Sequence, residues 1–190
     1  MKTGLFFGSF NPIHIGHLAI ANYMAEFRDI EKVWFVVSPH NPLKEKKTLL
    51  ANNHRLRMVR EAIGEYPKFK ASDIEFKLPQ PSYTINTLAY LKEKYPKTEF
   101  ALIMGSDNLQ TFDKWKNYKK ILKNHKIYVY PRQNADGGNF KNHPQIKFVP
   151  APMMEISAKF IRRSIKAQKD ISGMLPENVH KHIQQMNFYK

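Results

Sequence analysis

The sequence of 190 residues contains no cysteine, which excludes disulfides, thiolate zinc sites and thiol nucleophiles and agrees with a reducing compartment. It also contains no apolar run near the roughly 20 residues that a helix needs to cross a bilayer. The first ten residues, MKTGLFFGSF, reach a glycine turn too soon for a signal peptide. We therefore expect a soluble, cytoplasmic protein that does not bind a membrane.

Acidic residues are scarce, because 16 Asp and Glu stand against 31 Lys and Arg and leave a formal net charge of +15. A charge of this sign favours anionic partners, and nucleic acid, nucleotides and acidic metabolites are all open at this point. The length and a hydrophobic content of 42% suffice for one compact domain with a core. Residues 1–190 are therefore expected to form a single domain.

Short apolar segments alternate with helical patterns along the chain. Runs of branched and aromatic residues predict buried strands at residues 3–9, 32–39, 99–105, 126–132 and 146–152. Apolar steps of three and four residues predict helices over 18–24, 56–63 and 85–91, and two more helices follow Ser157 and Pro176. The polar segment 133–145 is expected to be a surface loop. This alternation predicts an α/β fold, a Rossmann-like doubly wound parallel sheet with a small helical C-terminal part, whose ligands bind at the carboxyl ends of the strands.

The segment GSFNPIHIGHLA, residues 8–19, follows the first predicted strand. Gly8 allows a tight turn there, and Gly16 lets a phosphate approach the backbone at a helix start, where free amides attract anions. His14 and His17 can both donate to phosphate oxygens. One histidine could instead cap or pack, and two histidines without a nearby carboxylate or thiolate make a poor zinc site. The pattern predicts phosphoryl or nucleotidyl transfer, with no metal site built from protein side chains.

The stretch GSFNPIHIGH resembles the nucleotide-binding signature of nucleotidyltransferases that carry the element His-x-Gly-His. Class I aminoacyl-tRNA synthetases share this element but also need a Lys-Met-Ser-Lys-Ser loop and a longer chain. Three further stretches, 81–91, 103–122 and 156–165, resemble in order the blocks of bacterial nicotinate-mononucleotide adenylyltransferases, and the segment 174–189 fits as well. Pantetheine-phosphate adenylyltransferase and glycerol-phosphate cytidylyltransferase lack the middle blocks.

This resemblance implies that ATP and nicotinate mononucleotide are joined into deamido-NAD and pyrophosphate in NAD biosynthesis, with Mg²⁺ bound mainly through the ATP phosphates. The alternatives are another His-x-Gly-His transferase, a dual-specificity enzyme included, or a nucleic-acid binding module suggested by basic runs such as KEKK and KNYKK. Because the positive residues are scattered along the chain, we expect small-molecule partners and no nucleic acid. The oligomeric state is open, a homo-oligomer included.

The resemblance also implies site residues. His14 and His17 would hold the triphosphate, with His17 at the α-phosphate. Asp107 follows a predicted strand and would accept from the ATP ribose, although it could instead cap a helix that starts near Leu109. The expected ATP contacts are Gly8, Ser9, Phe10, Gly16, Gly105, Asp107, Ser157 and Arg162.

For nicotinate mononucleotide, Trp115 can stack on the pyridine ring, and the amide of Thr84 at a helix start can bind the carboxylate. The expected contacts are Lys44, Arg55, Tyr83, Thr84 and Trp115, although Trp115 could be partial core and Lys44 a solvated loop charge. The sequence departs from the family pattern at Ala158 and Lys159, where a Ser and a Thr are usual, and at Phe7, where a second glycine is common. These changes put one hydroxyl contact to ATP and the shape of the first turn in question.

Overall fold

The computed structural model describes residues 1–39 and 49–190. Its sheet has six strands in the order β3-β2-β1-β4-β5-β6, and every neighbouring pair is parallel. The strands are β1 (Lys2–Gly8), β2 (Lys32–Val37), β3 (Phe69–Ser72), β4 (Glu99–Gly105), β5 (Ile127–Tyr130) and β6 (Ile146–Phe148). The predicted parallel sheet is confirmed, with one strand, β3, that the apolar runs did not predict.

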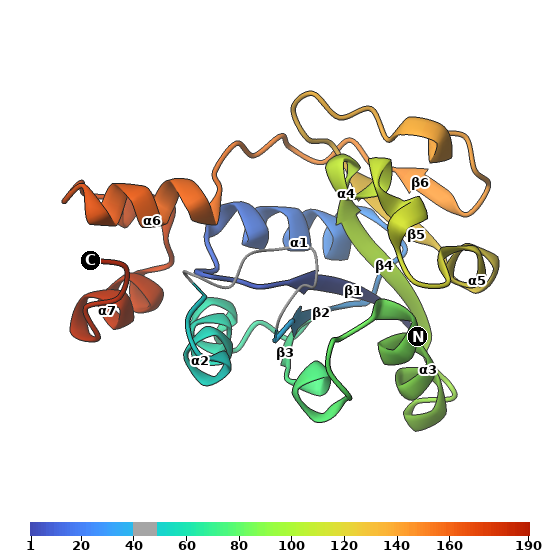
Figure 1. Ribbon diagram of the computed structural model, residues 1–190, viewed down its shortest axis with the longest axis horizontal. Coiled ribbons are helices and arrows are strands. Elements are labelled where there is room, and N and C mark those ends of the chain that lie inside the picture. The colour runs from blue at the N-terminus through green and yellow to red at the C-terminus, as the bar shows by residue number, and fades with distance from the viewer. Residues whose placement is uncertain (40–48) are drawn as a thin grey trace.

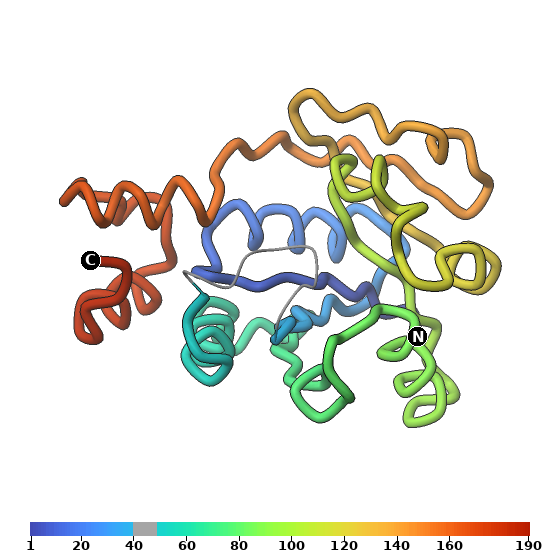
Figure 2. Tube along the Cα trace, in the orientation of Figure 1, coloured from blue at the N-terminus to red at the C-terminus, as the bar shows by residue number. Residues whose placement is uncertain are grey.

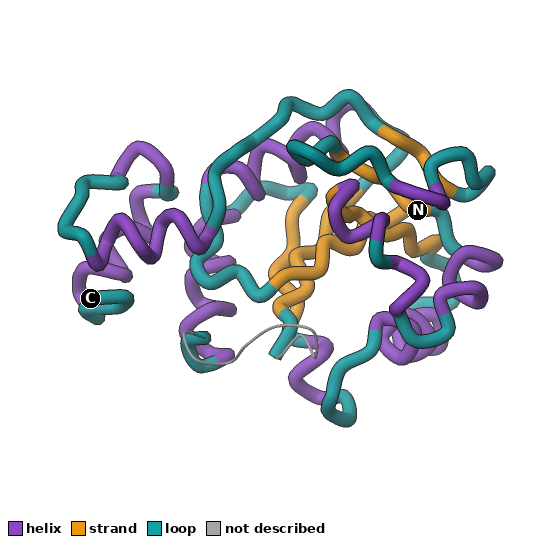
Figure 3. Tube along the Cα trace, turned by 45° about the horizontal axis from the view of Figure 1, so that its top comes forward, coloured by secondary structure: helices purple, strands orange, loops and turns teal. Residues whose placement is uncertain are grey.

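Helices surround this sheet on both sides (Figures 1 and 3). They are α1 (Ile15–Phe27), α2 (Asn52–Ile63), α3 (Thr84–Lys94), α4 (Ser106–Gln110), α5 (Tyr118–Asn124), α6 (Ala158–Lys166) and α7 (Glu177–Gln185). Each of the five predicted helices is present. Within the described ranges, no helix is long and apolar enough to span a membrane.

Side chains of the central strands alternate between two apolar layers, as the pleat of a strand requires. Phe6 and Ile103 pack with the buried residues of α1 and α2, whereas Leu5 and Leu102 pack with those of α3 and α5. The first layer also takes in apolar residues of α6 and α7. Burial on both faces explains why the central strands are almost continuously apolar, and it confirms the doubly wound arrangement.

The loop predicted over residues 133–145 is largely irregular and contains a short 3₁₀ helix at Gly138–Phe140. Two helices, α6 and α7, follow β6 and make the small helical C-terminal part. They lie at one end of the molecule, beside the start of α1 and α2 (Figures 1 and 2). This placement brings the last part of the chain to the end of the sheet where β1 finishes.

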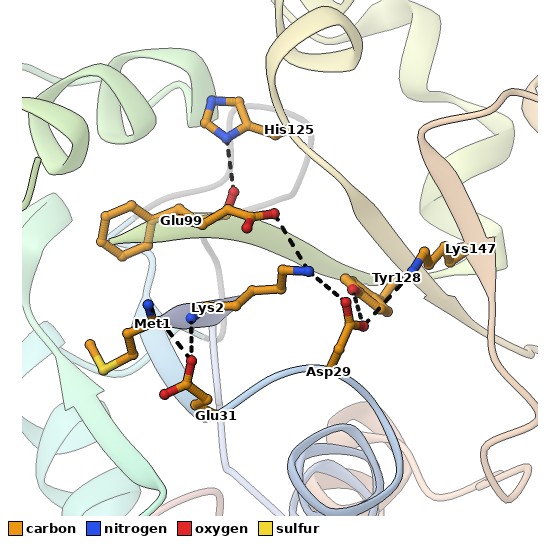
Figure 4. Close-up of polar contacts among 9 residues, drawn as sticks. Met1, Lys2, Asp29, Glu31, Glu99, His125, Tyr128 and Lys147 are labelled. Atoms are coloured by element: carbon orange, nitrogen blue, oxygen red, sulfur yellow. Dashed lines mark hydrogen bonds and ion pairs between the residues drawn. The ribbon is translucent and has the colours of Figure 1, made fainter. Parts of the chain in front are cut away.

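Charged side chains join the strands at the opposite, amino edge of the sheet (Figure 4). Asp29, in the loop between α1 and β2, accepts from the Lys2 ammonium at 2.5 Å and from the Tyr128 hydroxyl at 2.5 Å, and Lys147 lies 3.8 Å away. Lys2 also lies 3.5 Å from Glu99. We call these five residues the amino-edge cluster. Their contacts connect the first residues of β1, β4, β5 and β6 with the loop that contains Asp29.

Candidate active site

The connections of the sheet reverse direction between β1 and β4. From β1 the chain winds through β2 to β3 at one edge, and from β4 it winds through β5 to β6 at the other. The carboxyl ends of β1 and β4 therefore flank the crevice where open α/β sheets bind ligands. A cavity of about 630 Å³ opens there, and it is lined by Phe7, Gly8, Tyr83, Met104, Trp115 and Tyr130 among others. Phe7, the departure from the family pattern, thus forms part of the cavity wall.

The turn after β1 depends on Gly8. A Cβ at Gly8 would lie 2.8 Å from the ring of Phe10, so only glycine lets that ring fold back against the strand end. Phe10 has a left-handed backbone with φ of 44° and is 2% exposed, and its ring packs on Phe6, Phe35 and His17. Gly8 and Ser9 line the cavity, whereas Phe10 supports it from within the core. Phe10 can therefore meet a ligand only through its backbone.

The two histidines of the motif stack on each other. His14 is the residue before α1 and His17 is the third residue of α1, so the helix starts earlier than His17. Their ring centroids are 3.7 Å apart, and the His14 backbone N–H donates to Nδ1 of His17 at 3.2 Å. A neutral imidazole that accepts at Nδ1 carries its proton at Nε2. The fold thus makes Nε2 of His17 a hydrogen-bond donor.

His14 is neutral in this structure. The ring is 3% exposed, and burial, together with the positive charge of Arg132, lowers the pKa of His14 to about 4. An anion next to the ring would oppose both effects.

Asp107 follows β4 and folds back towards Arg132. Its Oδ1 lies 4.0 Å from Nε of Arg132, a nitrogen that has no hydrogen-bond partner among the described residues. A Cβ at Gly105 would collide with the same carboxylate, so glycine at the strand end leaves room for it. The capping alternative for Asp107 is wrong, because α4 begins at Ser106 with Gly105 as its cap. Arg132 lies beside two predicted site residues, Asp107 and His14, and was not itself predicted.

Gly16 leaves room for protein atoms. A Cβ at Gly16 would lie 3.1 Å from Nδ1 of His14 and 3.4 Å from Cβ of Met154, so glycine admits the stacked histidine and the segment before α6. The predicted role in phosphate approach is a separate property of its backbone.

Ser157 is the residue before α6, and Arg162 lies in the middle of that helix. The hydroxyl of Ser157 accepts from the Phe160 N–H at 3.2 Å, as expected of a cap. Arg162 donates from Nη1 to the backbone oxygen of Asn11 at 2.7 Å, which brings α6 to the loop of the histidine motif. Lys159, which stands where the family has a threonine, is exposed.

Arg55 is fully buried under the loops that follow β1 and β2. Its five N–H donors are all used, on the backbone oxygens of Leu50, Ser9, Ser38 and Pro39 and on the side chain of Asn52. Burial lowers the pKa of Arg55 to about 10, so the guanidinium is still charged at neutral pH. The predicted contact between Arg55 and the mononucleotide would require breaking one of these hydrogen bonds. In the structure, Arg55 instead connects the loop after β1 with the segment after β2.

The other predicted mononucleotide contacts meet at one wall of the cavity. Tyr83 caps α3, Thr84 is its first residue, and both line the cavity with Trp115. The Lys116 ammonium lies 4.4 Å from the centre of the Tyr83 ring, which adds a positive charge at this wall. Lys44 lies outside the described residues.

A buried carboxyl group, that of Glu75, lines the same cavity and was not predicted. It accepts from the Thr87 hydroxyl at 2.8 Å and from Ser38, and burial raises its pKa. Glu75 thereby ties the end of β2 to the first turn of α3. Its signal in the sequence is weak, because one glutamate in a polar stretch looks like a surface residue.

The described residues contain no group of three His, Asp or Glu side chains that could hold a metal ion. Phosphate oxygens are suitable ligands for Mg²⁺, which commonly binds through substrate phosphates.

A family model described as cytidylyltransferase-like matches residues 5–172 of the chain. This match, the doubly wound sheet and the histidine pair at its switch point together define a nucleotidyltransferase. A solved structure of the Plasmodium falciparum nicotinic acid mononucleotide adenylyltransferase, complexed with NaAD, has the same fold. It is 19% identical, with a TM-score of 0.82 over 99% of this chain and 97% of that one.

Sequence relatives are much more similar. A protein of Flavobacterium psychrophilum named probable nicotinate-nucleotide adenylyltransferase is 59% identical over the full length of both chains. One of Bacteroides fragilis with the same name is 49% identical over 96% of this chain and 90% of its own. The chain therefore belongs to the nicotinate-nucleotide adenylyltransferase family.

Proposed function

We propose that this chain transfers the adenylyl group of ATP to nicotinate mononucleotide, giving deamido-NAD and pyrophosphate, as a single cytoplasmic domain formed by residues 1–190. The observation that carries the proposal is the stacked pair of His14 and His17 at the end of β1, beside a cavity lined by Tyr83, Thr84 and Trp115. One end of this crevice suits a polyphosphate and the other a flat aromatic ring. The partners are small molecules.

In the reaction, a phosphate oxygen of the mononucleotide attacks the α-phosphorus of ATP. A P–O bond forms there, and the bond from the α-phosphorus to the bridging oxygen breaks, so pyrophosphate leaves with the electron pair. The protein contributes position and positive charge, because phosphoryl transfer needs no covalent nucleophile. Nε2 of His17 would donate to an α-phosphate oxygen as its charge grows. Mg²⁺, bound through the ATP phosphates, would supply further neutralisation.

Several residues of the crevice would orient ATP. The carboxylate of Asp107 would accept from ribose hydroxyls, and the backbone of residues 8–10 and of Gly16 would face the phosphates. Arg162 and Ser157 would approach the triphosphate from α6. The Nε atom of Arg132 is buried and lies 4.0 Å from Oδ1 of Asp107. Arg132 would therefore add a positive charge near the ribose of ATP.

The acid form of the mononucleotide would be recognised at the start of α3. Backbone amides there donate only, and a carboxylate accepts only, so the two match. A carboxamide would turn an N–H₂ towards one amide and leave it unpaired, which costs about 1 to 3 kcal/mol, or roughly fivefold to 150-fold. Lys116 beside Tyr83 favours the same substrate by its charge.

The test measures pyrophosphate release and the dinucleotide product from ATP and Mg²⁺, with nicotinate mononucleotide or its amide counterpart as acceptor. We expect kcat/KM for the acid to exceed that for the amide at least tenfold. His17→Ala should lower kcat about a hundredfold or more, because it removes one donor to the transition state. Its thermal melting should show that the variant is folded.

Three results would count against the proposal. Equal values for acid and amide would mean that the wall of Tyr83, Thr84 and Trp115 does not read the carboxylate. Turnover of a different phosphate acceptor alone would reassign the chain within the His-x-Gly-His transferases. Near-normal turnover by folded His17→Ala would remove that histidine from the mechanism.

A further inference from the structure

The loop between β1 and α1 is held by a residue near the end of the sequence. The hydroxyl of Tyr189 donates to Oδ1 of Asn11 at 2.8 Å, across 178 residues of chain. The same oxygen accepts from the Leu50 N–H at 3.3 Å, and the backbone oxygen of Asn11 accepts from Arg162. Figures 1 and 2 show the C-terminal segment at the end of the molecule where this loop lies.

Asn11 is well placed to transmit the position of Tyr189 to the site. It is 3% exposed and precedes His14 by three residues. On its other side the backbone oxygen of Ser9 is held by Arg55 at 2.6 Å. The loop that leads to the histidines is therefore held by hydrogen bonds from two other parts of the chain. Arg55 of α2 binds it at Ser9, and Arg162 and Tyr189 of the C-terminal part bind it at Asn11.

Tyr189 has an unusual local structure for a residue near a chain end. Its backbone is left-handed, with φ of 67°, a region that bulky residues rarely adopt because of the steric cost at Cβ. Burial raises the pKa of its phenol, against the opposing positive charges of Arg162 and Arg55, so the hydroxyl stays protonated. The steric cost of this backbone conformation must be offset by other interactions of Tyr189. Its hydrogen bond to the buried side chain of Asn11 is one such interaction.

We propose that Tyr189 is a positioning residue for the phosphate-binding loop, which acts through Asn11 to set the place of His14 and His17. This inference rests on the proposed nucleotidyl transfer. It predicts that the Tyr189 hydroxyl matters for the use of ATP and much less for the use of the second substrate, because Asn11 lies next to the histidine motif and not at the wall formed by α3.

Tyr189→Phe tests the proposal, because it removes the hydroxyl and keeps the ring. We expect kcat/KM for ATP to fall about tenfold, the usual scale of one buried hydrogen bond, while KM for nicotinate mononucleotide changes less than twofold. The matched control is Tyr66→Phe, which also removes a tyrosine hydroxyl with side-chain partners, Asn22 and Glu26, remote from the crevice. That variant should stay within twofold of the parent for both substrates.

Two further measurements separate positioning from a general loss of stability. In Asn11→Ala, adding Tyr189→Phe should cost little more, because the two residues act through one contact. Amide hydrogen exchange of residues 9–17 should be faster in Tyr189→Phe than in Tyr66→Phe at matched melting temperature. The exchange needs no turnover, so it tests the positioning role even if the parent proves inactive towards nicotinate mononucleotide.

The proposal is overturned if Tyr189→Phe uses ATP like the parent and its loop exchanges at the same rate. It is also overturned if KM rises equally for both substrates and the loss of turnover simply follows the melting temperature, since Tyr189 would then only attach α7. Additive effects of Asn11→Ala and Tyr189→Phe would show that Tyr189 acts elsewhere.

Discussion

His14 and His17 are three residues apart, yet their surroundings give them different chemistry. His17 accepts a backbone N–H at Nδ1 and so presents a proton at Nε2. His14 lies buried beneath it, next to the charge of Arg132. One ring therefore presents a hydrogen-bond donor, whereas the other has a lowered pKa that favours its neutral form.

The buried His14 should make the ligand-free protein less stable in mild acid. Its pKa is about 4 in the folded state against an ordinary 6.5, so between these values only the unfolded chain takes up the proton. Stability is complete above pH 6.5 and falls as the pH drops, by about 2 kcal/mol between pH 7.5 and 5. Burial lowers the pKa of His182 as well, which adds a decrease in the same direction.

Urea unfolding at the two pH values checks this expectation. His14→Asn should lose about 2 kcal/mol less than the parent on going to pH 5. His180→Asn, a change at a partly exposed histidine of α7, serves as the control and should behave like the parent. An identical decrease in the parent and His14→Asn would mean that His14 is already protonated when folded.

At the level of single residues, the motif histidines, the cap at Ser157 and the start of α3 could be predicted because each depends on a few neighbouring residues. Arg55 and Arg132 could not be assigned, because an arginine looks the same in a sequence whether it faces a ligand or five carbonyl groups. Tertiary contacts decide between these roles. The same is true of Asn11, which has hydrogen bonds with Leu50, Arg162 and Tyr189 that each join residues 39 or more positions apart.

Among the elements, the central strands were predicted well and the edge strands poorly. Strands β1, β2 and β4 are buried on both faces and read as apolar runs, whereas β3 has the sequence FKAS and lies at an edge. A strand that pairs on one side needs few apolar residues, so its sequence resembles a loop. Strand β6 ends at Phe148, earlier than the apolar residues that follow it suggest.

The amino-edge cluster should stabilise the sheet without affecting catalysis. The hydrogen bond from Lys2 and that from Tyr128 lower the pKa of Asp29, and burial together with Asp29 raises the pKa of Tyr128 to about 12. Asp29→Asn removes this acceptor charge. Because the carboxylate is half exposed, we expect a loss of only about 1 to 2 kcal/mol at pH 7.

This loss should become smaller in acid, and it disappears only below the lowered pKa of the folded carboxyl. The depressed pKa of Asp29 means that the parent loses stability as the pH falls below about 4, where the unfolded chain binds the proton first. Denaturant unfolding at pH 7 and pH 3 measures the difference. Glu177→Gln, which breaks an exposed pair with Lys181 on α7, is the control and should cost less stability than Asp29→Asn. A kcat/KM for ATP that changes in Asp29→Asn would link this edge to the crevice.

The whole molecule carries a net charge of +15, and both proposed substrates are anions. A positive field raises the local concentration of anions, and salt screens it, with a Debye length of about 10 Å at 0.1 M that shortens to about 3 Å at 1 M. We expect KM for ATP and for the mononucleotide to rise several-fold between 50 and 500 mM potassium chloride, with a smaller change in kcat. Tetramethylammonium chloride should raise KM as much as potassium chloride does, because screening depends on ionic strength and not on the kind of cation. KM values that stay constant would show that the net charge does not attract the substrates.

The contact between Asn11 and Tyr189 has a consequence for how the protein is made. A ribosome adds Asn11 early and Tyr189 only 178 residues later, and domains generally fold as units during synthesis. The strands and α1 can assemble while the chain is still being synthesised. The hydrogen bond between Tyr189 and Asn11, in the loop before His14, can form only when residue 189 has left the exit tunnel. A translation product that stops short of this residue would contain the whole histidine motif and still lack the contact that completes its loop.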